Sequence, residues 1–304
     1  MKKGIIALLL VLVLSGCNLP FKVVPNTTPT PTVGISNEIP FATATLLSVD
    51  TTQPPETPTA APETAGTDYS QSGISFKLPA CLAPEAVIST VPAVPPDPNG
   101  APSEFAPEHR QIQFNPYPLS GKFFNASVNI YPVAEFVQMR ADLQTQVQDL
   151  TNLLASHPAA LPATLPLLPS FNAAQVFHTR ESYIDFQNGS GIAFLTQYAQ
   201  FYAPANNHDL FYTFQGLTSD GKYWISAILP VSAVFLQEAW DSKTVPPNGA
   251  PLPPSDLSSP NFKAEMDNYY MTVKGLMASA SASDYTPDLT CLDVFLQSLK
   301  VENP

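Results

Sequence analysis

The pattern of apolar positions in the second half of the chain predicts a β-sheet with two apolar faces. Residues 210–217 and 223–229 carry apolar side chains at odd and even positions alike, around the turn-forming run Ser219-Asp-Gly-Lys222. Residues 176–186 and 192–202 form a similar pair of apolar runs. Glycine-containing turns between such runs are typical of β-hairpins. We therefore expect an antiparallel meander of three or four strands that is covered on both faces.

Apolar residues at helical spacing predict the helices that cover this sheet. Across residues 132–157 the apolar positions step by three or four residues, and Pro158 follows. Residues 261–282 carry the same kind of stripe. Such a stripe faces a core, and a helix tends to end just before a proline. A last helix is expected near the end of the chain, with Thr286 as N-cap and Pro287 in its first position.

Short apolar runs before the first helix predict further strands, at 74–78, 111–114 and 126–131. A long proline-rich loop is expected after the first of these strands, and another at 246–260. These elements together predict an α+β fold. In this fold amphipathic helices cover an antiparallel β-sheet meander, as an α/β sandwich.

The N-terminus has the layout of a secretory signal. Lys2 and Lys3 are followed by an apolar run without charges, residues 5–14, and then by the small residues Ser15 and Gly16. A basic start, an apolar run and small residues form a signal peptide. The apolar run is too short for a membrane-spanning helix, which needs about 20 residues.

The run Leu14-Ser15-Gly16-Cys17 resembles the lipobox of bacterial lipoproteins. This resemblance implies cleavage between Gly16 and Cys17, and a diacylglyceryl thioether on Cys17, often with an N-linked acyl chain as well. Two or three acyl chains hold a protein stably on a membrane. The protein is then expected on the extracytoplasmic face of the cell membrane, at the cell surface or in the periplasm.

Composition divides the remainder of the chain into a tether and a folded domain. Proline and threonine recur through residues 17–72, where apolar residues are sparse and aperiodic. A segment of this composition cannot bury enough apolar surface to fold. We therefore expect a signal peptide at 1–16, a lipidated and disordered tether at 17–72, and a single globular domain at 73–304.

Net charge excludes one class of partner. The whole chain has a net charge of −12, and losing Lys2 and Lys3 leaves 11 basic against 25 acidic residues, or −14. Binding to a phosphate backbone needs clustered lysine and arginine, and no such cluster occurs. We expect no nucleic-acid partner, and we expect the lipid to make the membrane contact.

Cysteine usage predicts a disulfide once Cys17 carries the lipid. Cys81 and Cys291 are then the cysteines that remain, an even number in an oxidising compartment. The alternative is a pair of buried free thiols. A bond between them is expected to pin the first strand to the last helix.

Motifs for catalysis and metal binding are missing from the sequence. The four histidines have no zinc-ligand spacing, and neither a Gly-x-Ser-x-Gly elbow nor a glycine-rich phosphate loop occurs. Glu181, Asp185 or Asp209 remain candidates for a glycosidase carboxylate pair, because distances in space are not visible in a sequence. The alternative is a solvated strand edge. We expect no cofactor and no metal, and we favour a protein that is not an enzyme.

A ligand-binding site is suggested by the segment Asn206-Asn207-His208-Asp209, which enters an aromatic strand. Polar groups at the mouth of an aromatic surface suit carbohydrate or peptide binding. Asn207, His208, Asp209 and Tyr212 are therefore the candidate ligand-binding residues. The alternative is a turn followed by a core strand.

The order of the elements is similar in outline to PsbP/Mog1-like sandwiches. The opening strand Gly73-Ile-Ser-Phe-Lys-Leu-Pro79 and the closing amphipathic helix also resemble extracytoplasmic lipoproteins of unassigned function. A fold does not define a function. Because the sequence has no catalytic motif, we favour a non-catalytic domain that binds or organises a protein or glycan at the cell surface. The alternatives are a hydrolase of surface glycan or peptide, and, as the PsbP outline implies, an accessory subunit of a membrane complex.

Overall fold

The computed structural model describes residues 65–97, 100 and 104–304. They all belong to one compact unit, Ala60–Pro304. Among the residues described, none of the helices is long and apolar enough to cross a membrane. The expected signal peptide, the lipidated Cys17 and most of the expected tether lie outside the described residues.

An antiparallel sheet in the order β3-β4-β5-β9-β8-β7-β6 forms the centre of this unit. Its strands are β3 (Glu85–Val91), β4 (His109–Asn115), β5 (Ser127–Pro132), β6 (Ala174–Phe186), β7 (Gly189–Ala199), β8 (Phe211–Thr218) and β9 (Tyr223–Pro230). Strands β6 to β9 are neighbours in chain order and pair antiparallel. The predicted meander is confirmed, and β5 extends it by pairing with β9.

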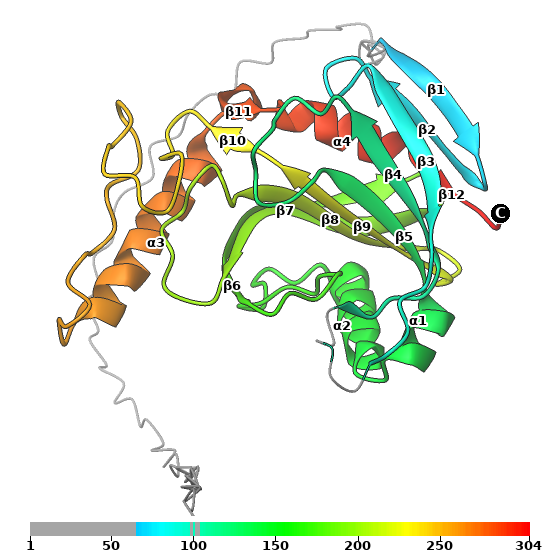
Figure 1. Ribbon diagram of the computed structural model, residues 1–304, viewed down its shortest axis with the longest axis horizontal. Coiled ribbons are helices and arrows are strands. Elements are labelled where there is room, and N and C mark those ends of the chain that lie inside the picture. The colour runs from blue at the N-terminus through cyan, green and yellow to red at the C-terminus, as the bar shows by residue number, and fades with distance from the viewer. Residues whose placement is uncertain (1–64, 98–99, 101–103) are drawn as a thin grey trace, which may run out of the picture. The chain divides into compact units, whose positions relative to one another are not determined.

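Helices cover both faces of this sheet, as its two apolar faces require (Figure 1). The helices α3 (Phe262–Ser279) and α4 (Leu289–Ser298) pack on one face, and α1 (Val133–Met139) and α2 (Leu143–Ser156) pack on the other. Successive residues of β8 point to opposite faces: Phe211 joins the core under α2, and Tyr212 joins the core under α4. The predicted α+β fold is therefore confirmed.

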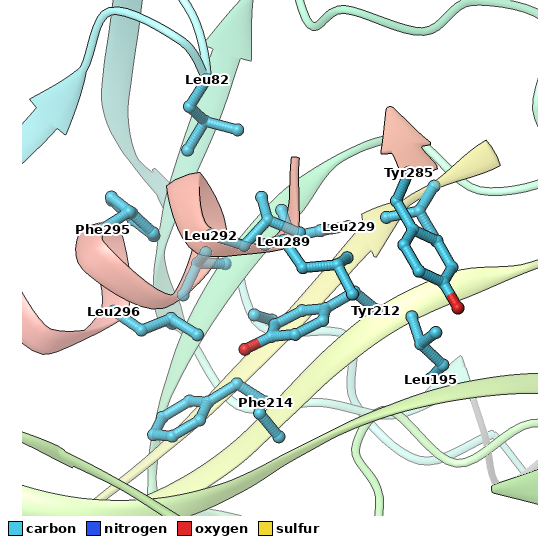
Figure 2. Packing of buried hydrophobic residues seen from close by; sticks show 14 of the residues in the cluster. Leu82, Leu195, Tyr212, Phe214, Leu229, Tyr285, Leu289, Leu292, Phe295 and Leu296 are labelled. Atoms are coloured by element: carbon cyan, nitrogen blue, oxygen red, sulfur yellow. The ribbon is translucent and has the colours of Figure 1, made fainter. Parts of the chain in front are cut away.

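A smaller sheet lies against α4. It contains β1 (Gly66–Gln71), β2 (Ile74–Pro79) and β12 (Lys300–Val301), in the order β1-β2-β12. The ring of Phe295 in α4 packs edge to face on Phe76 of β2 and on Phe114 of β4, at centroid distances of 5.2 and 5.3 Å. Figure 2 shows Leu292 and Leu296 of α4 in the same core.

The predicted disulfide is present in the structure. Cys81, which follows β2, is bonded to Cys291 in α4, with the two Cα atoms 6.1 Å apart. The bond joins the first strands of the described chain to the last helix. Before α4, a 3₁₀ helix at Ala282–Asp284 leads into β11 (Tyr285–Thr286), which pairs antiparallel with β10 (Ser232–Ala233).

Strand β1 lies inside the stretch 17–72 that the composition assigns to the tether. It pairs antiparallel with β2 along its whole length. Its Tyr69 stacks on Phe76 with ring centroids 5.1 Å apart, and the Tyr69 hydroxyl accepts a hydrogen bond of 3.0 Å from the amide of Ala86. The folded part therefore begins before Gly73. The sequence did not indicate this because β1 is polar and is held by its pairing with β2. Similarly, β3 occupies part of the expected proline-rich loop after Cys81, where Ala86 and Ile88 are buried.

The expected helix at 132–157 is divided in two. Arg140 lies in the break with an extended backbone, and its Nη2 contacts the Asp142 carboxylate at 2.5 Å. Arg140 is 8% exposed, so its charge needs this partner beside it. The last helix also begins later than expected, because Asp288 rather than Thr286 is its N-cap and accepts a hydrogen bond of 2.8 Å from the amide of Thr290.

Candidate functional site

The segment from Asn206 to Asp209 forms a turn that its own side chains stabilise. Asn206 is fully buried, and its Oδ1 accepts a hydrogen bond from the Asp209 amide at 3.0 Å. Its Nδ2 donates to the Asp209 carboxylate at 2.9 Å and to the carbonyl of Pro204 at 3.0 Å. A short polar residue that binds the backbone locally is typical of such turns.

Asn207 ties this turn to a neighbouring segment. Its Nδ2 donates to the carbonyls of Ala233 and Leu236 at 3.1 and 3.2 Å, and its Oδ1 accepts from the amide of Ala233 at 2.8 Å. The side chain is 3% exposed. The amide of Asn207 is therefore occupied by protein partners, and this residue positions the turn.

His208 is the accessible member of the predicted set. Its side chain is 42% exposed, and its Nδ1 lies 2.6 Å from the Asp209 carboxylate. The ring of Phe123, itself exposed, lies edge-on at 6.2 Å from the His208 ring. Asp209 therefore orients an imidazole that solvent can reach.

Tyr212 lies away from this turn, beneath α4. Figure 2 shows its ring among Leu289, Leu292 and Leu296. Its hydroxyl donates a hydrogen bond of 2.5 Å to the carboxylate of Asp293. Burial raises the pKa of the Tyr212 hydroxyl well above its ordinary value, and the nearby Asp293 charge adds to this effect. The structure thus brings Asn207, His208 and Asp209 together but separates Tyr212 from them.

The candidate glycosidase carboxylates have different partners. Glu181 contacts Nδ1 of His178, whereas Asp185 is exposed on β6 and Asp209 contacts His208. Within the described chain, no group of three or more His, Cys, Asp or Glu side chains is arranged to hold a metal ion.

Several exposed aromatic side chains lie in a row that begins beside the turn at residues 206–209. Sequence reasoning missed them. The amide of His208 donates to the carbonyl of Glu238 at 2.9 Å, two residues before Trp240. Trp240 is 56% exposed and packs edge to face on Phe201, which is 59% exposed, at 6.0 Å. The adjacent Tyr202 is also half exposed. The signal in the sequence was the adjacent pair Phe201-Tyr202 just after an apolar strand.

Phe201 and Tyr202 form one wall of an open groove of about 790 Å³ between the start of β6, the end of β7 and α3. The groove, which we call the aromatic groove, is lined by Phe171, Asn172, Ala173, Ala174, Gln175, Val176, Ala199, Gln200, Phe201, Tyr202 and Tyr270. None of these lining residues carries a charge. The aromatic groove therefore offers ring faces and neutral polar groups to a ligand.

Side-chain amides supply those polar groups. Gln200 Nε2 donates to the carbonyl of Asn172 at 2.7 Å, which holds the two edges of the aromatic groove together. Gln175 Oε1 accepts from the amide of Leu165 at 3.0 Å, while its buried Nε2 has no hydrogen-bond partner in the part of the chain that the structure describes. A buried donor without a partner is costly.

Comparison with known families identifies the N-terminus. Residues 1–18 match the family model of the prokaryotic membrane lipoprotein lipid attachment site. This match supports a bacterial lipoprotein that is held on a membrane by lipid, and it contains Gly16 and Cys17. The match does not reach the folded part, so the similarity to PsbP/Mog1-like sandwiches is not shown. Among curated proteins, no match to the chain was found.

Proposed function

We propose that this lipoprotein is a non-catalytic binding protein on the extracytoplasmic face of the membrane, and that it binds a neutral glycan in the aromatic groove. The observation that carries the proposal is the lining of that groove, which combines exposed aromatic rings with amides and lacks charged residues.

Ring faces and amides match the two kinds of surface that a sugar presents. The C–H face of a pyranose packs against aromatic side chains such as Phe201 and Tyr202, which are large and apolar. Sugar hydroxyls both donate and accept hydrogen bonds, as do the amides of Asn172 and Gln200.

Charge argues for a neutral ligand. The chain without its signal has a net charge of −14, and long-range repulsion then disfavours acidic ligands. A basic ligand is not favoured either, since the lining of the aromatic groove has no carboxylate. A neutral polysaccharide fits both conditions.

The anchor and tether fit this role. We propose that Cys17 carries the lipid after removal of residues 1–16, and that the proline- and threonine-rich residues 17–65 form the tether. As a flexible coil of this length, the tether averages about 40 Å end to end. The domain can then reach a glycan layer beyond the lipid headgroups.

Tryptophan fluorescence of the full chain in detergent tests the binding proposal. The protein has two tryptophans: Trp224 is 1% exposed and Trp240 is 56% exposed, so acrylamide quenches mainly Trp240. Soluble oligomers of glucose, N-acetylglucosamine and mannose are the probes. We expect at least one of them to change the emission or quenching of Trp240 saturably, because Trp240 packs against Phe201.

Variants of the aromatic groove make this test specific. Phe201→Ala and Tyr202→Ala are each expected to weaken binding about tenfold, equivalent to about 1.4 kcal/mol. Leu257→Ala is the control, since Leu257 is 78% exposed but does not line the groove. If no oligosaccharide binds, or if the groove variants bind like the control, the proposal is wrong. Release of shorter sugars during the titration would instead indicate the hydrolase.

A further inference from the structure

The strand β6 contains a bulge on the side of the sheet that faces α3 and α4. Thr179 pairs with Leu195 and Ser182 pairs with Ala193, so Arg180 and Glu181 stand opposite a single residue of β7. Arg180 has a φ of +55°, which is unusual for a residue with a side chain. Bulges of this kind redirect side chains and are frequent beside functional sites.

A pocket of about 410 Å³ lies above this bulge. It is lined by Thr179, Arg180, Glu181, Ser182, Leu195, Tyr212, Ala278, Ala282, Leu289 and Asp293, and we call it the bulge pocket. The residues come from the sheet, from the end of α3, from the 3₁₀ helix and from α4. The bulge pocket is separate from the aromatic groove, because the two share no lining residue.

Arg180 is held in the wall of the bulge pocket without an acidic partner. Its Nη1 donates to the carbonyls of Met277 at 3.1 Å and Ala280 at 2.5 Å, at the C-terminal end of α3. Its guanidinium lies 5.4 Å from the centre of the Tyr285 ring. Among the described residues, no carboxylate lies within ion-pair distance of Arg180, so its guanidinium faces the pocket without a direct ion pair.

Asp293 is an acidic group in the same pocket, and it is also unpaired. It accepts a hydrogen bond from the Tyr212 hydroxyl at 2.5 Å, but no cation of the described chain lies within ion-pair distance. Burial raises the pKa of this carboxyl by more than the Tyr212 hydrogen bond and the Arg180 charge lower it. A carboxylate in such surroundings is stabilised by a nearby cation.

We propose that the bulge pocket binds a small zwitterion of the amino-acid class, with the ligand carboxylate on Arg180 and the ligand ammonium on Asp293. Both charges line one pocket without forming an ion pair with each other, so a ligand that carries the two opposite charges fits between them. Arginine suits carboxylates because its planar donors match their geometry. Leu195, Ala278 and Leu289 leave apolar surface for a small side chain.

The capping of α3 explains only part of this arrangement. A cation at a helix C-terminus is stabilised by the helix dipole, which accounts for the contacts of Arg180 Nη1. It does not explain why Asp293 and the Tyr212 hydroxyl are buried in the same pocket. A zwitterionic ligand accounts for both charges together.

Calorimetric titration of the full chain in detergent tests this proposal. The probes are the standard L-amino acids and L-alanyl-L-alanine, and each amino acid that binds is compared with its N-acetyl derivative and its amide. These derivatives each lack one of the two charges. We expect saturable binding of at least one zwitterion, and binding about tenfold or more weaker for both derivatives.

Matched variants assign the binding to this pocket. Asp293→Asn keeps the shape of the side chain and is expected to weaken binding of the zwitterion about tenfold or more. Arg180→Lys keeps the positive charge but loses the planar donors, and an intermediate loss is expected. Asp267→Asn on the exposed part of α3 is the control and is expected to bind like the wild type. Thermal unfolding of each variant checks that it is folded.

Three results would overturn the proposal. They are the absence of binding by every probe, equal binding of the singly charged derivatives, and equal binding by folded Asp293→Asn and the Asp267→Asn control. None of these results bears on the aromatic groove, because the probes and the variants of the two sites differ.

Discussion

At the scale of single residues, Asp293 is a carboxyl group in a largely buried environment. The Tyr212 hydroxyl of β8 donates to it, Arg180 of β6 faces it without pairing, and Asp288 of α4 adds a second negative charge nearby. Burial is the largest effect and raises the pKa of the Asp293 carboxyl above its ordinary value. Its ionised form is therefore less stable in the folded protein than in the unfolded chain.

The stability of Asp293→Asn should depend on pH in a defined direction. Because the pKa is raised on folding, the folded state binds more protons between the unfolded and folded pKa values, and wild-type stability falls as pH rises through this window. Asparagine cannot ionise, so the variant should have the higher urea midpoint at neutral pH. This gain should shrink as pH falls towards about 4, the pKa of an unfolded aspartate.

Urea unfolding at several pH values measures this effect. Asp185→Asn is the matched control, since Asp185 is exposed on β6. A variant that is less stable than the wild type at neutral pH would show that the charge of Asp293 stabilises the fold, contrary to this interpretation.

At the scale of elements, long-range contacts hold the first strands to the end of the chain. Arg110 of β4 is 6% exposed, and its Nη1 donates to the carbonyls of Ser72 at 2.7 Å and Glu302 at 2.8 Å. Its guanidinium also lies 4.6 Å from the centre of the Tyr223 ring. One side chain of the large sheet thus contacts both the turn between β1 and β2 and the residue that follows β12. The Cys81–Cys291 bond links the other end of β2 to the start of α4.

Removing this disulfide should destabilise the domain without changing its fold. The bonded residues are 210 positions apart, so the bond restricts a long loop of the unfolded chain. Replacing both cysteines by alanine should lower the free energy of unfolding by about 2–5 kcal/mol.

Urea unfolding with and without a reducing agent checks this prediction. The wild type should lose stability on reduction, whereas Cys81→Ala/Cys291→Ala should be unaffected by the reducing agent. Equal urea midpoints for the oxidised wild type and the double variant would contradict the prediction.

At the scale of the whole molecule, the protein combines a lipid attachment signal with a folded unit that has its own core. The signal matches over residues 1–18, and the folded unit buries apolar clusters on both faces of its large sheet. The match over residues 1–18 supports anchoring by lipid, and two or three acyl chains hold a protein stably on a membrane.

Cys17→Ala should therefore release the protein from membranes. Without the thiol no lipid can be attached, and the acidic net charge of −12 gives no attraction to anionic headgroups. Fractionation of producing cells into membrane and soluble parts measures the release. Ser15→Ala is a suitable control, because it keeps a small residue before the cysteine. A Cys17→Ala variant that stays in the membrane fraction as fully as this control would show that the lipid is not the anchor.

The helices and the meander were predictable because their information is local. Apolar spacing along 261–282 and glycine-containing turns between strands depend on neighbouring residues. Strand β1 was not predictable, since it is polar and depends on pairing with β2 and on one stacked ring, Tyr69. The break at Arg140 likewise depends on the side chain of Asp142 and on burial.

The candidate sites were likewise predictable only where neighbouring residues define them. The sequence left open whether Asn207, His208 and Asp209 bind a ligand or form a turn before a core strand, and the structure contains such a turn. Sequence patterns also grouped Tyr212 with these residues, although alternation along β8 turns it towards Asp293 instead. Neither the aromatic groove nor the bulge pocket was visible, because each is assembled from residues of several elements.

Lipid attachment, the cysteine pair and the two-sided sheet follow from the sequence alone, since each depends on residue type, count or local period. The residues that face one another across the aromatic groove and the bulge pocket were decided only by tertiary structure. Leu195 of β7, Arg180 of β6 and Asp293 of α4 line one pocket although long stretches of chain separate them. Strand pairing and helix packing bring such residues together, and no local pattern records which partners will meet.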